Sequence, residues 1–235
     1  MKPVVVFRHA RCEGAGYLGT FLEQRDIPWC EVRIDLGDAL PATPKDFSGL
    51  VFMGGPMSVN DDLPWIAHAL NLIREAVQED IPVLGHCLGG QLMSKALGAE
   101  VKVNHIKEIG WGDVRVSEDE EAKKWFGETK QFASFHWHGE TFSLPQGAKH
   151  LLSSQYCQNQ AWSIGKHFAM QCHIEMTEEM VQAWCYVGQQ EVLASLESPG
   201  VQSADAIVLA APSLVPDLNQ QAQNVYAQWI KGLSF

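Results

Sequence analysis

The sequence lacks the features that would assign it at once to several large classes of protein. No apolar run approaches the ~20 residues needed to cross a bilayer. The six cysteines include no C-x-x-C pair, whereas disulfide scaffolds are short and cysteine-dense. Basic residues are outnumbered, with 17 Lys and Arg against 28 Asp and Glu and a net charge of −11, while general nucleic-acid binding depends on clustered Lys and Arg. We therefore expect a cytoplasmic protein without membrane or nucleic-acid partners.

The composition that remains is globular. Of the 235 residues, 46% are hydrophobic and 19% are charged. A chain of this size buries roughly 70% of its extended surface on folding, so it can form a core without disulfide bonds. The short apolar run at residues 3–7 meets charged residues at once, which indicates a first strand and not a signal peptide.

Strand and helix patterns alternate in the first half of the chain. β-branched and aromatic runs predict strands, and apolar residues at helical spacing predict helices between them. The predicted strands are residues 3–7, 29–34, 49–53 and 81–84. The predicted helices are residues 14–25 and a segment whose start is marked by Asp62 with Pro64. Such alternation implies βαβ units. We predict an α/β fold with a mostly parallel sheet and helices on both faces.

The second half has a different pattern. Strands are predicted at residues 109–116 and 131–135, and several short ones between residues 149 and 173. Between the first two, Ser117 and Glu120 fit a capping box at the start of an acidic helix. Helical periodicity dominates after residue 177. We predict a main domain at residues 1–180 and a C-terminal helical extension at residues 181–235, packed on the same domain.

The most informative segment contains Gly85, Cys87 and Gly89. It follows a predicted buried strand and precedes helix-forming residues, which is the setting of a nucleophile elbow. The turn places the sulfur at a helix N-terminus, where the positive end of the dipole favours a thiolate. The backbone N–H of Leu88 would point toward an oxyanion formed by attack of that sulfur. The alternative is a buried structural cysteine in an ordinary βα turn.

A thiolate nucleophile requires a base, and the base requires an orienting acceptor. His173 is the first candidate, because Glu175 lies two residues further on and residues i and i+2 of a strand share a face. The next candidates for the base are His86, His136 and His138.

Gly54-Gly55-Pro56 also follows a predicted strand, at the edge where open α/β sheets bind ligands. Its glycines let the backbone approach a substrate closely and donate N–H groups. His9 follows the first strand and lies near the same predicted edge, and we expect it to be structural. A plain turn is the alternative for the glycine pair alone.

These patterns, in this order, resemble a class I glutamine amidotransferase domain. They are G-G-P at residues 54–56, G-x-C-x-G-x-Q at residues 85–91 and H-x-E at residues 173–175. The resemblance covers roughly residues 1–180 and is closest to stand-alone members that resemble the glutaminase domain of GMP synthase. The segment F-H-W-H-G-E-T-F at residues 135–142 supports that subgroup. The resemblance implies a three-layer, flavodoxin-like fold.

The resemblance also implies a catalytic triad of Cys87, His173 and Glu175. Cys87 would attack the side-chain amide of glutamine to give a γ-glutamyl thioester and ammonia, and water would then release glutamate. No cofactor and no metal is implied. The other site residues that the resemblance implies are Gly55 and Leu88 for the oxyanion hole, and Gln91 with the backbone around Trp137, His138 and Gly139 for the amino-acid end of glutamine.

The sequence departs from the family in two places and lacks an acceptor domain. Ile174 replaces the proline of the family's H-P-E, and Cys172 stands where an aromatic residue is frequent, so Cys172 is a candidate for oxidation. Neither an S-G-G-x-D-S pyrophosphatase loop nor a G-x-x-x-x-G-K-[ST] phosphate loop is present. The ammonia would therefore pass to a separate synthase subunit, or the protein hydrolyses a γ-glutamyl compound for its own sake.

Four further possibilities stay open at this point. A γ-glutamyl peptidase would use the same triad on a different substrate, and a non-catalytic regulatory subunit would keep only the fold. The C-terminal helices could bury a homodimer interface. Metal-dependent hydrolysis is disfavoured, because no ligand spacing completes a tetrahedral site. Its candidate ligands are His136, His138, Cys172, His173 and Glu175.

Overall fold

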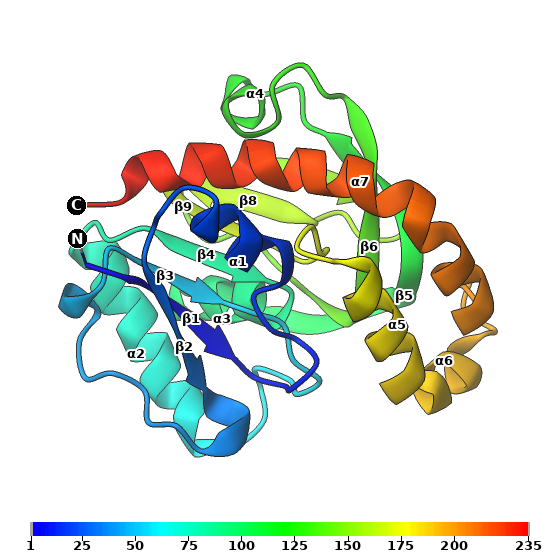
Figure 1. The fold of residues 1–235 in the computed structure, drawn as a ribbon, viewed down its shortest axis with the longest axis horizontal. Coiled ribbons are helices and arrows are strands. Elements are labelled where there is room, and N and C mark those ends of the chain that lie inside the picture. The colour runs from blue at the N-terminus through cyan, green and yellow to red at the C-terminus, as the bar shows by residue number, and fades with distance from the viewer. Residues whose placement is uncertain (1, 235) are drawn as a thin grey trace.

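The structure, a computed structural model that describes residues 2–234, is an alternation of strands and helices that closes with a long helix (Figure 1). The strands are β1 (Val4–Arg8), β2 (Trp29–Arg33), β3 (Gly49–Phe52), β4 (Val83–His86), β5 (Val101–Val116), β6 (Gln131–Phe142), β7 (Lys149–Ser154), β8 (Ala161–Ile164), β9 (His167–Met170) and β10 (Gly200–Val201). The helices are α1 (Gly16–Glu23), α2 (Pro64–Gln78), α3 (Leu88–Ala96), α4 (Glu120–Phe126), α5 (Glu178–Val187), α6 (Gln189–Ser195) and α7 (Ala204–Trp229). Three short 3-10 turns complete these elements.

All ten strands form one mixed sheet. Five neighbouring strands are parallel in the order β2-β1-β3-β4-β9, which is the 2-1-3-4-5 order of flavodoxin-like sheets. The predicted α/β class and layer arrangement are confirmed. The sheet is less parallel than expected, because β8, β7, β5 and β6 join it through antiparallel pairings.

Two apolar cores lie on the two faces of the sheet. β1 is buried on both sides, and its side chains alternate between the cores: Val4 and Val6 face α1 and α7, while Val5 and Phe7 face α2 and α3. A strand covered on both faces reads as a continuous apolar run, as residues 3–7 do. The three layers therefore follow from the sequence pattern, and they bring the carboxyl ends of the parallel strands to one edge.

Several predicted boundaries are wrong. β5 begins at Val101 and β6 continues to Phe142, because the two strands pair along their length even where the residues are polar. The predicted capping box fails, since Asp119 caps α4 and accepts a hydrogen bond from the N–H of Glu121. The helical pattern predicted after residue 177 begins with two short helices, α5 and α6, which meet at Gly188.

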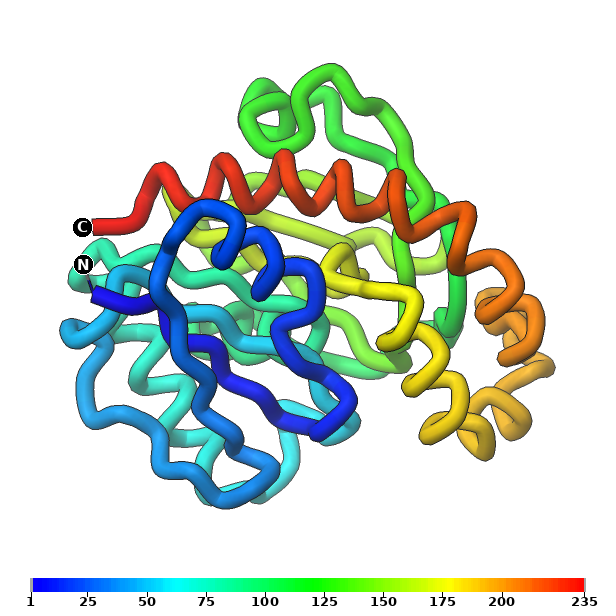
Figure 2. The backbone as a smooth tube through the Cα atoms, viewed as in Figure 1, coloured from blue at the N-terminus to red at the C-terminus, as the bar shows by residue number. Residues whose placement is uncertain are grey.

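The last helix, α7, crosses one face of the sheet beside α1 (Figure 2). Its apolar side carries Leu218, Val225, Tyr226 and Trp229, all of which are buried in the same core as α1. Within residues 2–234, no helix is both long enough and apolar enough to cross a membrane.

Candidate active site

The segments singled out from the sequence meet at the carboxyl ends of three parallel strands. The Gly54-Gly55 loop follows β3, Cys87 follows β4, and His173 lies three residues after β9. A two-residue bridge between Phe135 and His173 ties the last of these segments to β6, through hydrogen bonds of 2.8 and 3.3 Å. Residues far apart in the chain therefore converge at the edge where flavodoxin-like sheets bind ligands.

Cys87 occupies a strained turn between β4 and α3. Its φ of 49° and ψ of −107° lie in a region that residues other than glycine rarely adopt. A Cβ atom on Gly85 would lie 2.5 Å from the carbonyl carbon of Gly89, and one on Gly89 would collide with the carbonyl oxygen of Phe52. The two glycines are therefore required by close backbone packing, as expected for a nucleophile elbow.

The sulfur of Cys87 has polar neighbours on two sides. The side chain of Gln171 donates a hydrogen bond to Sγ at 3.4 Å, and Sγ lies 3.8 Å from the carbonyl oxygen of Trp137. Leu88 is the first residue of α3, where a backbone N–H has no acceptor within the helix. The residue Gln171 was missed in the sequence, although it lies only two residues before His173.

His173 and Glu175 form a tight buried pair. Nδ1 of His173 and Oε1 of Glu175 are 2.6 Å apart, and both residues are almost fully buried. Burial disfavours the charged form of each group, but the attraction between the opposite charges is stronger. His173 and His86 therefore lower the pKa of Glu175 to about 2. Burial likewise opposes a charged His173, yet Glu175 and the Cys87 sulfur raise its pKa well above the ordinary value. Nε2 of His173, the ring atom left for Cys87, makes no hydrogen bond within residues 2–234.

The carboxylate of Glu175 also faces His86. Nε2 of His86 lies 3.7 Å from Oε2 of Glu175 and 3.0 Å from the hydroxyl of Tyr226 on α7. Burial lowers the pKa of His86, so its ring is neutral near neutral pH. The C-terminal helix thus reaches the His–Glu pair through one hydrogen bond, a contact that the sequence did not predict.

His9 fixes the glycine loop from the opposite side. Its Nδ1 lies 3.0 Å from the carbonyl oxygen of Met53 and 3.2 Å from that of Gly54, so its N–H donates to both. Burial lowers the pKa of His9 to about 4. The ring is therefore neutral, and it holds the loop in a conformation that brings Gly55 beside Leu88.

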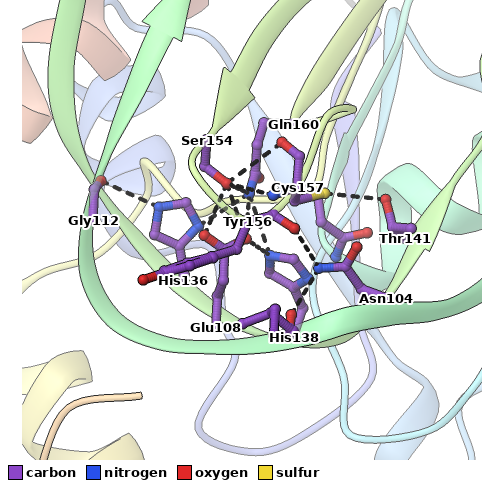
Figure 3. Close-up of polar contacts among 12 residues, drawn as sticks. Asn104, Glu108, Gly112, His136, His138, Thr141, Ser154, Tyr156, Cys157 and Gln160 are labelled. Carbon is purple, nitrogen blue, oxygen red and sulfur yellow. Dashed lines mark hydrogen bonds and ion pairs between the residues drawn. The ribbon is translucent and has the colours of Figure 1, made fainter. Parts of the chain in front are cut away.

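A cavity of about 710 Å³ opens above Cys87. Six of the predicted site residues line it, namely Gly55, Cys87, Gln91, Trp137, His138 and Gly139. Leu88, His173 and Glu175 are almost completely buried behind its wall. The amide of Gln91 donates to Gln171 at 3.1 Å, and the imidazole of His138 is directed into a buried polar cluster with Glu108, His136 and Gln160 (Figure 3).

Two residues of this cavity were not expected from the sequence. Trp184 packs edge-on against the ring of His173 with centroids 4.8 Å apart and also lines the cavity. Glu13 lines the cavity too, and a Cβ atom on Gly54 would touch both its carboxylate and the ring of His173. Burial raises the pKa of Glu13 to about 7, against the opposing influence of His173.

The other cysteines have different surroundings. Burial raises the pKa of Cys172 to about 12, that of Cys157 to about 11 and that of Cys185 to about 11, so their thiols stay protonated at neutral pH. Cys172 is also fully buried, which argues against its predicted sensitivity to oxidation. The candidate metal ligands named from the sequence do not form one group. His136 and His138 face Glu108 and not the His173–Glu175 pair.

The fold and the turn at Cys87 place the protein among α/β proteins that carry a cysteine elbow at the edge of a flavodoxin-like sheet. The family model described as "Glutamine amidotransferase class-I" matches residues 26–182. The chain therefore belongs to the class I glutamine amidotransferase family, as the sequence motifs indicated.

Two proteins are similar to this chain over most of its length. The crystal structure of a glutamine amidotransferase from Methylobacillus flagellatus superposes with a TM-score of 0.96 and 45% identity, over 100% of this chain and 96% of the other. The glutamine amidotransferase-like protein YfeJ of Salmonella typhimurium is 32% identical over 78% of this chain and 80% of its own length.

Two relatives with named activities match shorter stretches. The glutamine-hydrolysing GMP synthase subunit of Sulfurisphaera tokodaii is 31% identical over 60% of this chain and 74% of its own length. Gamma-glutamyl peptidase 3 of Arabidopsis thaliana is 27% identical over 57% of each chain. The relationship to GMP synthase is confirmed, and the relatives include both of the activities considered from the sequence.

Proposed function

We propose that the protein is a glutaminase that hydrolyses the side-chain amide of glutamine through a thioester on Cys87. The observation that carries the proposal is the 2.6 Å pair of His173 and Glu175 beside an elbow cysteine at the floor of a cavity. A base oriented by a buried carboxylate, next to a nucleophile at a helix N-terminus, is the arrangement that acyl transfer requires.

The steps follow from the positions of these groups. The Cys87 sulfur forms a bond to the amide carbon, and the negative oxygen accepts hydrogen bonds from the N–H groups of Gly55 and Leu88. His173 gives a proton to the nitrogen as the carbon–nitrogen bond breaks, which releases ammonia. Water then attacks the thioester, His173 takes its proton, and glutamate leaves with the thiolate restored. None of these steps uses a cofactor.

By similarity to the glutamine-hydrolysing GMP synthase subunit, we propose that the ammonia passes to a separate synthase subunit. Residues 137–139 and Gln91 would hold the amino-acid end of glutamine, since they line the cavity around Cys87. A cytoplasmic location and a homodimer through the C-terminal helices remain further proposals.

A second candidate is the hydrolysis of larger γ-glutamyl compounds. The cavity of about 710 Å³ lies in the range of pockets for drug-sized ligands, and its wall includes the apolar residues Met57, Trp184 and Val187. This observation and the gamma-glutamyl peptidase relative favour a leaving group larger than ammonia. Assays should therefore compare glutamine with γ-glutamyl dipeptides.

Labelling with a diazo-ketone analogue of glutamine tests the proposed function without a partner protein. We expect a single alkylated cysteine, Cys87, identified by peptide mass mapping, and protection by excess glutamine. The matched control is Cys30→Ala, which removes an exposed thiol and should leave the labelling unchanged. Absence of labelling, or labelling spread over several cysteines, would contradict a glutamine site at Cys87.

We expect Tyr226→Phe to lower kcat several-fold and to leave KM nearly unchanged. The substitution removes the hydroxyl that contacts Nε2 of His86, and His86 in turn faces Glu175. Loss of this buried hydrogen bond should also lower the free energy of unfolding by about 1–3 kcal/mol. Tyr186→Phe, on the exposed side of α5, is the control and should change neither quantity. This result would support the proposal that residues 181–235 act with the main domain.

We expect Glu13→Gln to weaken glutamine binding in a pH-dependent way. Within residues 2–234 the Glu13 carboxylate has no ion-pair partner, so we propose that it binds the α-ammonium group of the substrate. With a pKa of about 7, Glu13 is ionised above neutral pH and protonated below it. The substitution should therefore raise KM by about 10-fold or more on the alkaline side, the value of a charged hydrogen bond, and much less on the acid side. An equal effect at both pH values, or the same effect in exposed Glu23→Gln, would contradict this role.

A further inference from the structure

A second group of reactive side chains lies between β5 and β6. Glu108 on β5 is directly opposite His138 on β6, and His136 lies two residues before His138 on the same face (Figure 3). The three side chains are buried, and their nearest nitrogen and oxygen atoms all lie within 4.8 Å of one another. The side chains of this Glu108 cluster form no bond in the proposed glutaminase steps, although His138 also lines the first cavity.

Both imidazole rings are oriented by backbone carbonyls. Nε2 of His136 lies 3.2 Å from the carbonyl oxygen of Gly112, and Nδ1 of His138 lies 3.0 Å from that of Glu140. A carbonyl can only accept, so each of these nitrogens carries the ring proton. In the neutral rings the unprotonated nitrogens, Nδ1 of His136 and Nε2 of His138, therefore point into the cluster. Nε2 of the neutral His138 ring then lies 3.1 Å from a carboxylate oxygen of Glu108. These two atoms are both hydrogen-bond acceptors, with no proton between them.

The cluster has too few donors for its acceptors. The hydroxyl of Ser154 donates to Glu108 at 2.8 Å. The side-chain nitrogen of Gln160 lies 2.9 Å from Glu108 and 3.3 Å from each of the two histidines. An amide group has two N–H bonds and cannot donate to all three. The oxygen of the same amide is buried and has no hydrogen-bond partner within residues 2–234. Rotating the amide by a half-turn would exchange the two atoms and direct the oxygen into the cluster, without changing the shape of the side chain.

We propose that Glu108, His136, His138 and the side-chain oxygen of Gln160 bind a divalent transition-metal ion, with Zn²⁺ as the best match. Bonds of about 2.0–2.1 Å at tetrahedral angles place ligand atoms about 3.3 Å apart. Four of the six separations are 2.9, 3.1, 3.3 and 3.3 Å, with the present nitrogen position of Gln160 taken as that of its oxygen after rotation. The other two, from His136 to Glu108 and to His138, fall in a group whose ligand atoms lie within 4.8 Å of one another. Histidines that bind zinc commonly donate their other N–H to a carbonyl, as both histidines do here.

The ion would have an entrance and a structural role. Glu108, His136 and Ser154 also line a second cavity, of about 640 Å³, whose lining does not include Cys87. Four protein ligands leave no open position, which is typical of structural zinc. The ion would brace the segment of β6 that carries Trp137 and Gly139 on the wall of the first cavity. This inference does not depend on the proposed glutaminase activity.

Metal titration of the purified full-length chain, stripped with a chelator, tests the site. We expect one Zn²⁺ per chain, and a Co²⁺ derivative with the strong visible bands of a tetrahedral site but without a thiolate charge-transfer band. Glu108→Gln should weaken binding by more than about 100-fold, since loss of an outer partner alone costs up to that factor. His105→Gln removes an exposed histidine of the same strand and should bind as the wild type does.

A second variant keeps the test decisive if Glu108→Gln does not fold. Gln160→Glu supplies a charged oxygen ligand, so its melting temperature should fall in the stripped protein and recover when Zn²⁺ is added. The site is disproved if the wild type binds no stoichiometric metal, if Co²⁺ shows thiolate ligation, or if Zn²⁺ does not rescue Gln160→Glu. In those cases the 3.1 Å contact between His138 and Glu108 is a hydrogen bond that Nε2 of His138 donates to the carboxylate.

Discussion

Replacing Cys87 by alanine is expected to abolish the release of glutamate from glutamine and from γ-glutamyl compounds. The sulfur is the only group at the floor of the cavity that the proposed mechanism uses to form a covalent bond, and no other step compensates for its loss. Removal of a triad nucleophile leaves only the contributions of binding and the oxyanion hole, so we expect a decrease in kcat of at least roughly 10⁴-fold. A coupled glutamate assay on both substrate classes provides the measurement.

The control for this result is Cys185→Ala. Its thiol is buried and its pKa is raised to about 11, so it offers a matched cysteine without nucleophilic character. Turnover by Cys87→Ala at the wild-type rate would overturn the triad. If the wild type turns over neither substrate class, an ammonia-accepting synthase is added. A glutaminase that is silent without its partner then becomes active, whereas a regulatory subunit stays inactive.

His173→Ala should lower kcat by at least about 10²-fold, the lower end of the contribution of a positioned general base. It should also destabilise the fold by about 3–5 kcal/mol, since Glu175 is left as an unpaired buried charge. The double variant His173→Ala/Glu175→Gln removes that charge and should recover part of the stability without recovering activity. An unchanged rate in His173→Ala would assign the base elsewhere, with His86 the nearest buried imidazole.

The stability change in His173→Ala should depend on pH in a defined direction. The lowered pKa of Glu175 means that its contribution is present above the ordinary value of 4.5 and is lost as the pH falls toward about 2. The raised pKa of His173 means that its contribution is present below the ordinary value of 6.5 and is lost as the pH rises through the elevated value. Denaturant unfolding should therefore show the largest difference from the wild type between pH 4.5 and pH 6.5. A difference that grows outside this window would contradict the charged pair.

Much of this site could be predicted because its signals are local. The elbow needs glycines at fixed positions around Cys87, and the structure requires both of them for backbone packing. His173 and Glu175 are close in the chain, so a two-residue spacing was enough to pair them. The parallel core was also readable, because strands buried on both faces are continuous apolar runs.

The parts that escaped prediction depend on contacts between distant segments. Tyr226 reaches His86 across 140 positions of the chain, and no local pattern marks a helix residue for that contact. From the sequence, His138 was grouped with residues 172–175 as a candidate metal ligand. In the structure, the pairing of β5 with β6 brings Glu108 opposite it. The same pairing explains why both strands exceed their predicted lengths. Strand pairing can extend through polar residues when backbone hydrogen bonds continue, and hydrophobic periodicity does not record this.

The position of α7 has a consequence for the order of folding during synthesis. This helix follows every strand of the sheet in the chain, and it covers the core face that α1 shares. A nascent chain that already contains the elbow and the His–Glu pair still exposes that apolar face until α7 has left the ribosome. Domains generally fold as units while transiently exposed apolar surface promotes aggregation. We therefore expect Cys87, the proposed nucleophile, to reach its final surroundings only after α7 has been synthesised, and we expect the shorter nascent chain to bind chaperones.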